Sequence, residues 1–279
     1  MIIVGVDGSV TARAAVEWAA NDALRMREPL RIVHAVDRSP YQIDRFPNTG
    51  LPDTLLRDGQ RILREALALA HERQPGVEVT TRDIEGAPAE VLREQAKEAT
   101  EIVVGSRGLG GFAGALLGSV STHVAGHVDC PVVVVRGDRQ PVHGEIVVGV
   151  DDSPACEPAL AYAFRQAELR GSALRVVHAW QPVHAFAPGV PYDMDEVRAA
   201  QHQVVRDRLE RCMKDYPQVT VVEDVQPAQP VEALTDASAR ADLLVVGSHG
   251  HGAVGALLLG SVSRGVLHHA RCPVAVVRA

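Results

Sequence analysis

Hydrophobic and polar positions follow two periods along this chain, and the two alternate. Short, continuous apolar runs predict buried parallel strands, and the first of them, residues 2–6, ends in Asp-Gly-Ser. Apolar residues spaced three and four positions apart predict helices that bury one face. In the first half of the chain, strands are predicted over residues 2–6, 31–36, 77–84, 102–105 and 132–136. Helices are predicted through residues 15–24, over 51–73, from Pro88 through Ala96, and over 119–128.

Five strands joined by four helical crossovers predict an open parallel sheet with helices on both faces. Ser9 or Thr11 is placed to cap the first helix. The strand over 77–84 has the weakest pattern, as expected nearer an edge. In such sheets ligands bind beyond the carboxyl ends of the strands, where the winding direction reverses. Candidate chemistry therefore belongs to the turn after the first strand, the end of the second strand and the loop after the fourth.

The chain repeats itself once. The clearest matching segments are 2–9 with 146–153, 30–35 with 174–179, and 103–108 with 245–250. The spacing between partners falls from 144 to 142 residues, so the second half is two residues shorter somewhere in the middle. This predicts two similar domains, residues 1–138 and 145–279, joined through a turn-rich stretch. We expect them to pack about a pseudo-twofold axis through their last strands, because an open sheet edge needs covering.

The composition is that of a globular protein: 46% of residues are hydrophobic and 23% are charged. No apolar run approaches the roughly 20 residues needed to cross a bilayer, and the chain begins at once with a predicted strand. Four scattered cysteines are too few for a disulfide scaffold. These features predict reduced thiols, a cytoplasmic location and no membrane span.

The net charge of −7 argues against a duplex-binding protein, which usually carries a basic patch. Only two of the 28 basic residues are lysines, Lys97 and Lys214. A P-loop needs Gly-Lys-Ser/Thr, which does not occur. Residues 108–113 resemble a dinucleotide fingerprint, but that fingerprint belongs after the first strand and has no match in the second half. We reject both motifs.

The loop after the fourth strand carries the strongest signal for binding. It reads Gly-Ser-Arg-Gly at 105–108, nine residues, then Gly-Ser-Val-Ser at 118–121, and the second half repeats this spacing at 247–250 and 260–263. Glycines let backbone amides approach a ligand and turn inward as an anion nest. The second segment opens a helix, whose free N–H groups and positive dipole end attract phosphate. The pattern predicts a phosphate site made of backbone amides and hydroxyl groups, with tight turns and simple helix capping as the structural alternative.

Histidines and cysteines invite other interpretations. His34 and His178 end the second strand of each half, where a hydrogen-bonded place at the pocket rim is favoured over a catalytic one. Metal candidates are the pairs His127 with Cys130 and His269 with Cys272. Each pair supplies two ligands, whereas structural zinc takes four. We therefore predict no metal site.

Together these motifs resemble the universal stress protein family, in its tandem, ATP-binding branch. The resemblance covers nearly the whole chain: Val-Gly-Val-Asp-x-Ser opens each half, Gly-x2-Gly-x9-Gly-Ser follows, and Cys-Pro-Val leads into each last strand. It implies two Rossmann-like, doubly wound α/β domains that bind adenine nucleotides. The implied cofactor is ATP at two sites, with Mg²⁺ as a candidate companion.

The resemblance also implies where each part of ATP lies. Asp7 and Asp151 should lie against the adenine beside Gly5 and Gly149, and Ala35 and Ala179 should offer backbone contacts to the base. Gly105 and Gly247 should line the ribose. The implied phosphate residues are Gly108, Gly118, Ser119 and Val120, with Gly250, Gly260, Ser261 and Val262 in the second half. Ser106, Arg107, Ser121, Ser248, His249 and Ser263 complete the predicted set. Whether Arg107 and His249 touch phosphate or solvent stays open. Asp152 replaces Gly8, which we expect to alter the affinity of the second pocket.

The leading functional hypothesis is a nucleotide-responsive regulator of stress adaptation or growth, with little or slow ATP hydrolysis and no catalytic residues. Fast phosphoryl transfer needs a cationic clamp, a positioned base and Mg²⁺, and the two loops contain one arginine and no lysine. Slow hydrolysis, autophosphorylation at a loop serine, and an ATPase or nucleotidyl transferase activity stay open. We expect a homodimer, an unidentified protein partner and no nucleic acid. The long loops over 41–52 and 186–192 are candidate lids.

Overall fold

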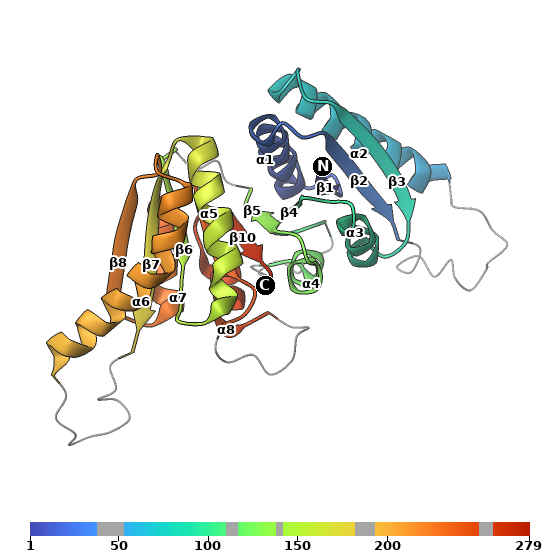
Figure 1. The fold of residues 1–279 in the computed structure, drawn as a ribbon. Helices are drawn as coiled ribbons and strands as arrows, with labels where there is room; N and C mark the ends of the chain where they lie inside the picture. Colours follow the sequence, from blue (N-terminus) through green and yellow to red (C-terminus); the bar gives the residue numbers. More distant parts are fainter. Residues whose placement is uncertain (38–52, 110–116, 138–141, 182–192, 251–258) are drawn as a thin grey trace. The chain divides into compact units, whose positions relative to one another are not determined.

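The structure, a computed structural model, describes residues 1–37, 53–109, 117–137, 142–181, 193–250 and 259–279. The chain divides into two compact units, Met1–Arg139 and Gln140–Ala279, which Figure 1 colours from blue to red along the sequence. The candidate lids at 41–52 and 186–192 lie outside the described residues, as does most of the rejected fingerprint. The predicted pseudo-twofold relation between the halves stays a prediction.

The first unit alternates strands and helices as its apolar pattern predicts. Its elements are β1 (Ile2–Val6), α1 (Val10–Met26), β2 (Leu30–Val36), α2 (Asp53–Arg73), β3 (Val79–Glu85), α3 (Pro88–Ala96), β4 (Glu101–Gly105), α4 (Ser119–His127) and β5 (Val132–Val135). Differences are confined to the ends of elements. The helix predicted over 51–73 begins at Asp53, for example, and the strand predicted over 77–84 spans Val79–Glu85.

The strands of the first unit form a parallel sheet in the order β3-β2-β1-β4-β5. β1 is central and pairs in parallel with β2 on one side and β4 on the other. The chain therefore winds outward in both directions, and the winding reverses between β1 and β4. Helix α1 packs against α2, and α3 packs against α4, so that helices cover both faces (Figure 1). The predicted doubly wound fold is confirmed.

Local chemistry explains why these elements form where they do. α1 begins at Val10 because the Ser9 side chain accepts a hydrogen bond from the Ala12 N–H at 3.1 Å, so Ser9 rather than Thr11 is the cap. The helix ends where Arg27 adopts a left-handed conformation, with φ of 55°. β1, β4 and β5 are buried almost throughout, whereas β3 is largely exposed. The weak pattern of β3 thus reflects its place at the sheet edge.

The second unit repeats this plan. Its elements are β6 (Glu145–Gly149), a 3₁₀ turn (Pro154–Cys156), α5 (Glu157–Arg170), β7 (Ala173–Trp180), α6 (Met194–Asp215), β8 (Val221–Pro227), α7 (Pro230–Ala237), a second 3₁₀ turn (Ser238–Arg240), β9 (Leu243–Gly247), α8 (Ser261–His269) and β10 (Val274–Val277). The strand order β8-β7-β6-β9-β10 matches that of the first unit. The extra 3₁₀ turn before α5 is the main departure from the first half.

Strand register locates the two-residue difference between the halves. Leu30 pairs with Val79 in the first unit, and Leu174 pairs with Val221 in the second. The first members of these pairs are 144 residues apart and the second members 142 residues apart. α2 and α6 end at Arg73 and Asp215, also 142 residues apart. The shortening therefore lies between β7 and α6, and it makes Gly59 and Gln201 equivalent positions.

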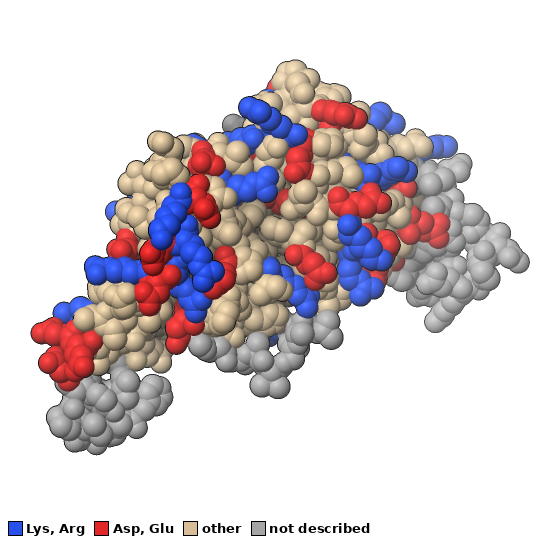
Figure 2. Space-filling model, viewed as in Figure 1, with Lys and Arg blue, Asp and Glu red and all other residues tan. Residues whose placement is uncertain are grey.

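Charged side chains of both signs intermingle on the face drawn in Figure 2. Arg61 pairs with Asp58 and Glu65 on its own helix, and Arg175 pairs with Glu145 and Asp224. Among the described helices, none is both long enough and apolar enough to cross a membrane.

Candidate functional site

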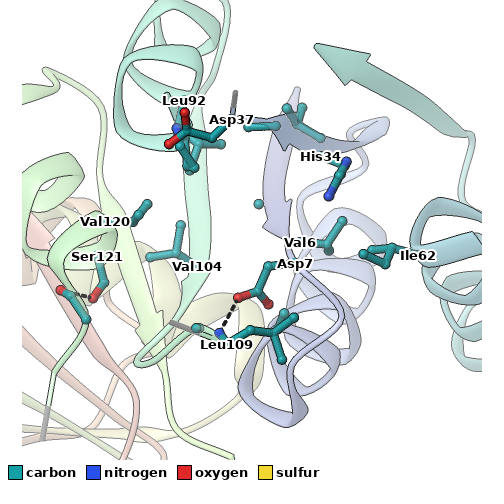
Figure 3. Close-up of a pocket in the computed structure, with 18 of the residues that line it drawn as sticks. Val6, Asp7, His34, Asp37, Ile62, Leu92, Val104, Leu109, Val120 and Ser121 are labelled. Atoms are coloured by element: carbon teal, nitrogen blue, oxygen red, sulfur yellow. Dashed lines mark hydrogen bonds between the residues drawn. The ribbon is translucent and has the colours of Figure 1, made fainter. Parts of the chain in front are cut away.

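A cavity of about 550 Å³ lies at the carboxyl edge of the first unit's sheet, where the winding reverses between β1 and β4. The ends of β1, β2 and β4 line it, together with α2, α3 and the start of α4 (Figure 3). Its size falls within the range of pockets for small organic ligands. The fold thus places a cavity where such sheets bind ligands.

Asp7 joins the first turn to the loop after β4. Its carboxylate accepts hydrogen bonds from the Ser9 N–H and the Leu109 N–H, both at 2.9 Å, and the second is the dashed line beside Asp7 in Figure 3. A Cβ atom on Gly108 would lie 2.6 Å from the nearer Asp7 oxygen. Only glycine therefore allows the loop to lie this close to the carboxylate.

The start of α1 packs directly on the end of β4. The hydroxyl groups of Ser9 and Thr11 both donate to the Arg107 carbonyl oxygen, the first at 3.3 Å. A Cβ atom on Gly105 would lie 2.8 Å from the carbonyl carbon of Thr11. The absence of a side chain at Gly105 lets these two backbone segments meet beside the cavity.

Helix α4 presents an uncapped N-terminus to the cavity. Gly118 is its N-cap, and no side chain caps this end in the described part of the chain. The Gly118 N–H donates to the Ser106 carbonyl oxygen at 2.7 Å, and the Ser121 hydroxyl donates to the Gly118 carbonyl oxygen at 2.9 Å. The hydroxyl proton of Ser121 is therefore used within the protein. The backbone N–H groups of the first turn, beginning at Ser119, provide the donors that an anion would need.

The opposite side of the cavity is mainly apolar. β1 pairs with β2 only as far as Val6 with His34, so Ala35 lies past the end of this pairing and lines the cavity. Leu92 of α3 covers Gly5, where a Cβ atom would lie 2.9 Å from a Leu92 methyl carbon. Leu92 and Val104 are drawn on this side in Figure 3, with Asp37 beside Leu92. Such a wall suits a flat, largely apolar ring.

The structure brings most of the predicted site residues of the first half to this one cavity. Its lining includes Gly5, Asp7, Ala35, Gly105, Arg107, Gly108, Gly118, Ser119, Val120 and Ser121. Ser106 is buried and does not line it. Arg107 is exposed, while Ser119 is exposed at the start of α4.

Residues beyond the sequence motif also reach the cavity. The Nδ1 atom of His34 lies 2.8 Å from a carboxylate oxygen of Asp83 on β3, and Gly59 of α2 faces the His34 ring. The rim position favoured for His34 is confirmed, with its hydrogen bond. Asp83 gives no local signal, because it lies on an exposed edge strand and only the pairing register brings it beside His34.

The second unit repeats the geometry of the phosphate segment. Gly260 is the N-cap of α8, again with no capping side chain among the described residues, and its N–H donates to the Ser248 carbonyl oxygen at 2.8 Å. The Ser263 hydroxyl donates to the same oxygen at 2.9 Å. A Cβ atom on Gly250 would collide with the Asp151 carboxylate, as on Gly108 with Asp7. Gly250, Gly260 and Ser263 thus repeat the contacts of Gly108, Gly118 and Ser121.

Other side chains of the second unit are used differently. Asp151 accepts from the Ser153 N–H at 3.1 Å and from the Ser153 hydroxyl at 2.6 Å. His249 lies inside the loop with Nδ1 2.9 Å from the Ser248 hydroxyl. Burial raises the pKa of the Cys156 thiol, whose sulfur lies 3.4 Å from the Asp151 carbonyl oxygen. That thiol stays protonated near neutral pH.

The histidines and cysteines considered as metal ligands in the sequence are found in contacts within the protein. His127 stacks on His123 with ring centroids 4.1 Å apart, and burial raises the pKa of Cys130 to about 11. Cys272 is buried. Within the described segments, no three His, Cys, Asp or Glu side chains gather as a metal site would require.

Fold and site together define a tandem α/β protein whose candidate ligand groups are largely backbone amides at a helix start. The chain belongs to the universal stress protein family, whose profile matches residues 1–136 and 144–278. A universal stress protein of Mycobacterium tuberculosis is 37% identical over 289 residues, which cover 99% of this chain and 96% of the relative. One of Mycolicibacterium smegmatis is 36% identical over 287 residues, with the same coverage of 99% and 96%.

Solved structures agree on the fold. A universal stress protein from Archaeoglobus fulgidus matches with a TM-score of 0.68 at 19% identity, covering 99% of this chain and 96% of that chain. The family and the tandem organisation predicted from the motifs are confirmed.

Proposed function

We propose that this chain is an ATP-binding regulator that holds one nucleotide in each half and hydrolyses it slowly or not at all. The observation that carries the proposal is the uncapped start of α4 at the cavity, flanked by Gly108 and Gly118. Helix N-termini with free N–H groups attract phosphate without needing a cationic side chain. The same arrangement at the start of α8 supports a second site.

In this proposal each part of ATP would occupy its own region of the cavity. The triphosphate would accept hydrogen bonds from the N–H groups of Ser119 and Val120, with exposed Arg107 able to add a positive charge. The adenine would lie on the apolar side, near Ala35 and Leu92. Asp7 would face the base and ribose, because their amino and hydroxyl groups can donate to a carboxylate, whereas phosphate would be repelled.

Mg²⁺ usually binds through phosphates, waters and one or two carboxylates. Asp58 lines the cavity with a largely exposed side chain and could supply such a carboxylate. When bound, the ion would neutralise charge on the triphosphate.

The charges near the site favour binding over rapid chemistry. The chain's two lysines, Lys97 and Lys214, pair with Glu94 and Glu210 on their own helices. No lysine is among the described residues that line the cavity, and of its two lining arginines Arg61 is paired with Asp58 and Glu65. This leaves Arg107 as the clamp for a transferring phosphoryl group. Family membership supports a role in stress adaptation or growth. The homodimer, the protein partner and the cytoplasmic location stay predictions.

Nucleotide content and affinity test the proposal directly. Mass spectrometry of the molecule released from denatured protein should detect ATP, and calorimetry should give two ATP per chain. Gly108→Ala and Gly250→Ala should each remove one site, with an affinity loss of tenfold or more, because each added methyl displaces the loop from its aspartate.

Gly76→Ala is the matched control, because a Cβ atom there has nothing within 4 Å. Absence of measurable ATP binding by the wild type would refute the proposal. Rapid ATP turnover, or pyrophosphate release with an added acceptor, would instead support the enzyme alternative.

A further inference from the structure

One side of the first unit's cavity is formed by a histidine that a neighbouring strand holds in place. His34 ends β2, and its ring lines the cavity on the side of Val6 and Ile62 (Figure 3). The side chain is 12% exposed, and its Nδ1 atom lies 2.8 Å from Asp83. Gly59 of α2 leaves room for this pair, since a Cβ atom there would lie 2.8 Å from Asp83 Oδ2 and 3.0 Å from His34 Nδ1.

The Asp83 carboxylate determines how this ring can bond to a ligand. An ionised carboxylate only accepts hydrogen bonds, so Nδ1 of His34 must donate the proton. In the neutral ring, Nε2 then carries a lone pair and accepts. Among the described residues, Nε2 has no hydrogen-bond partner in the protein. The side chain keeps 12% of its surface exposed, so this unpartnered acceptor is open to a donor from water or from a ligand in the cavity.

The second unit uses up the equivalent histidine within the protein. The Nδ1 atom of His178 lies 3.0 Å from the Val150 carbonyl oxygen and therefore donates to it, and Nε2 lies 2.8 Å from the Oε1 position of the Gln201 amide. The neutral ring accepts at Nε2 when the Gln201 amide is turned so that its NH2 group takes that position. Gln201 is the counterpart of Gly59. Val225, which pairs with His178 in the sheet, takes the place of Asp83 and can accept no side-chain hydrogen bond. Both ring nitrogens of His178 therefore have a partner within the protein, and the residue is buried, whereas His34 is partly exposed.

We propose that His34 is a ligand-contacting residue specific to the N-terminal pocket, oriented by Asp83 and given space by Gly59. Its Nε2 atom accepts a hydrogen bond from a hydroxyl or amino group of the nucleoside part of the ligand. The N-terminal pocket consequently binds nucleotide more tightly than the C-terminal pocket. This inference rests on the proposed nucleotide-binding function, and it adds the rule by which the two sites differ.

Calorimetry on the full chain can isolate the N-terminal pocket in a Gly250→Ala background. There, His34→Phe keeps a ring of similar size but removes the acceptor. We expect the Kd for ATP to rise about three- to tenfold, the usual effect of one hydrogen bond. ATP analogues that lack the 2′-hydroxyl, the 3′-hydroxyl or the 6-amino group identify the donor. One of these analogues should bind the Gly250→Ala protein more weakly than ATP does. When His34→Phe is added, that analogue and ATP should bind with equal affinity.

A second variant guards against simple misfolding. Gly59→Gln with Asp83→Val copies the arrangement that the second unit already folds with, and it should weaken N-terminal binding by a similar factor. Gly76→Ala, in the loop after α2, should leave binding unchanged. If His34→Phe and the double variant both bind ATP as tightly as the Gly250→Ala protein, the role of His34 is refuted, while the proposed nucleotide binding still stands. A background that binds no ATP would overturn the proposed function as well.

Discussion

The two halves agree at the start of α4 and α8 but differ in the turn that follows the first strand. In the first half, α1 begins directly after its Ser9 cap, and Thr11 packs against Gly105. In the second half, a 3₁₀ turn with Pro154 comes first and α5 begins at Glu157. Arg208 of α6 holds this turn by donating to the Asp152 carbonyl oxygen at 2.6 Å and to Glu157 at 2.8 Å.

This contrast separates what the ligand site requires from what each half can vary. The glycine-bounded helix start has the same backbone hydrogen bonds in both units, as binding by backbone amides would require. The surrounding side chains, including those at Gly59 and Gln201, fill the space in different ways. Variants made in equivalent pairs can therefore show which parts of the site are shared.

The largest expected effect concerns a contact that both halves share. Leu92 covers Gly5, and Leu234 covers Gly149 in the same way, with 4% and 3% of each leucine exposed. Leu92→Ala and Leu234→Ala should each lower the free energy of unfolding of their own half by about 3 kcal/mol, because each leaves a buried cavity. Urea titrations can follow each half separately in single-tryptophan variants, which keep either Trp18 in α1 or Trp180 at the end of β7 and replace the other by phenylalanine. Costs that differ by more than about 2 kcal/mol would break the proposed equivalence.

A smaller effect should distinguish the halves. Gly105→Ala places a methyl group 2.8 Å from the Thr11 backbone, whereas in Gly247→Ala the nearest atom is the His249 carbonyl oxygen at 3.2 Å. Gly105→Ala should destabilise the first half by about 2–3 kcal/mol, and Gly247→Ala should cost the second half about 1 kcal/mol or less. The same single-tryptophan titrations measure both. Equal costs would show that the turns do not constrain β4 and β9 differently.

The smallest effect depends on pH. Burial raises the pKa of Cys130 from 9.0 to about 11, so between these values the unfolded chain loses the thiol proton while the folded chain keeps it. Stability should therefore fall as the pH rises from about 9 to 11, by on the order of 1–2 kcal/mol.

Cys130→Ala should remove this part of the slope for the Trp18 half. The comparison uses the slope against pH, because the substitution also changes packing. An unchanged slope would mean that the Cys130 thiol ionises in the folded protein as it does in the unfolded chain.

Local patterns explain how much of the molecule was predictable from sequence. Strands such as Ile2–Val6 are read from a continuous apolar run, and the phosphate segment from glycines within one stretch of chain. The His34–Asp83–Gly59 arrangement was not predictable, since its members come from three elements and meet only through the strand register. The contact of Thr11 with the Arg107 carbonyl oxygen likewise depends on how α1 packs on β4.

The central claim is that nucleotide binds to backbone amides of the β4–α4 and β9–α8 segments. Glycine-selective ¹⁵N labelling gives one amide signal for each of the 24 glycines during an ATP titration. The account predicts saturable shifts at Gly108, Gly118, Gly250 and Gly260, with little change at Gly76 and Gly171, where a Cβ atom would meet nothing within 4 Å. If the amide signals of these four glycines all stay unchanged at saturating ATP, the claim is contradicted.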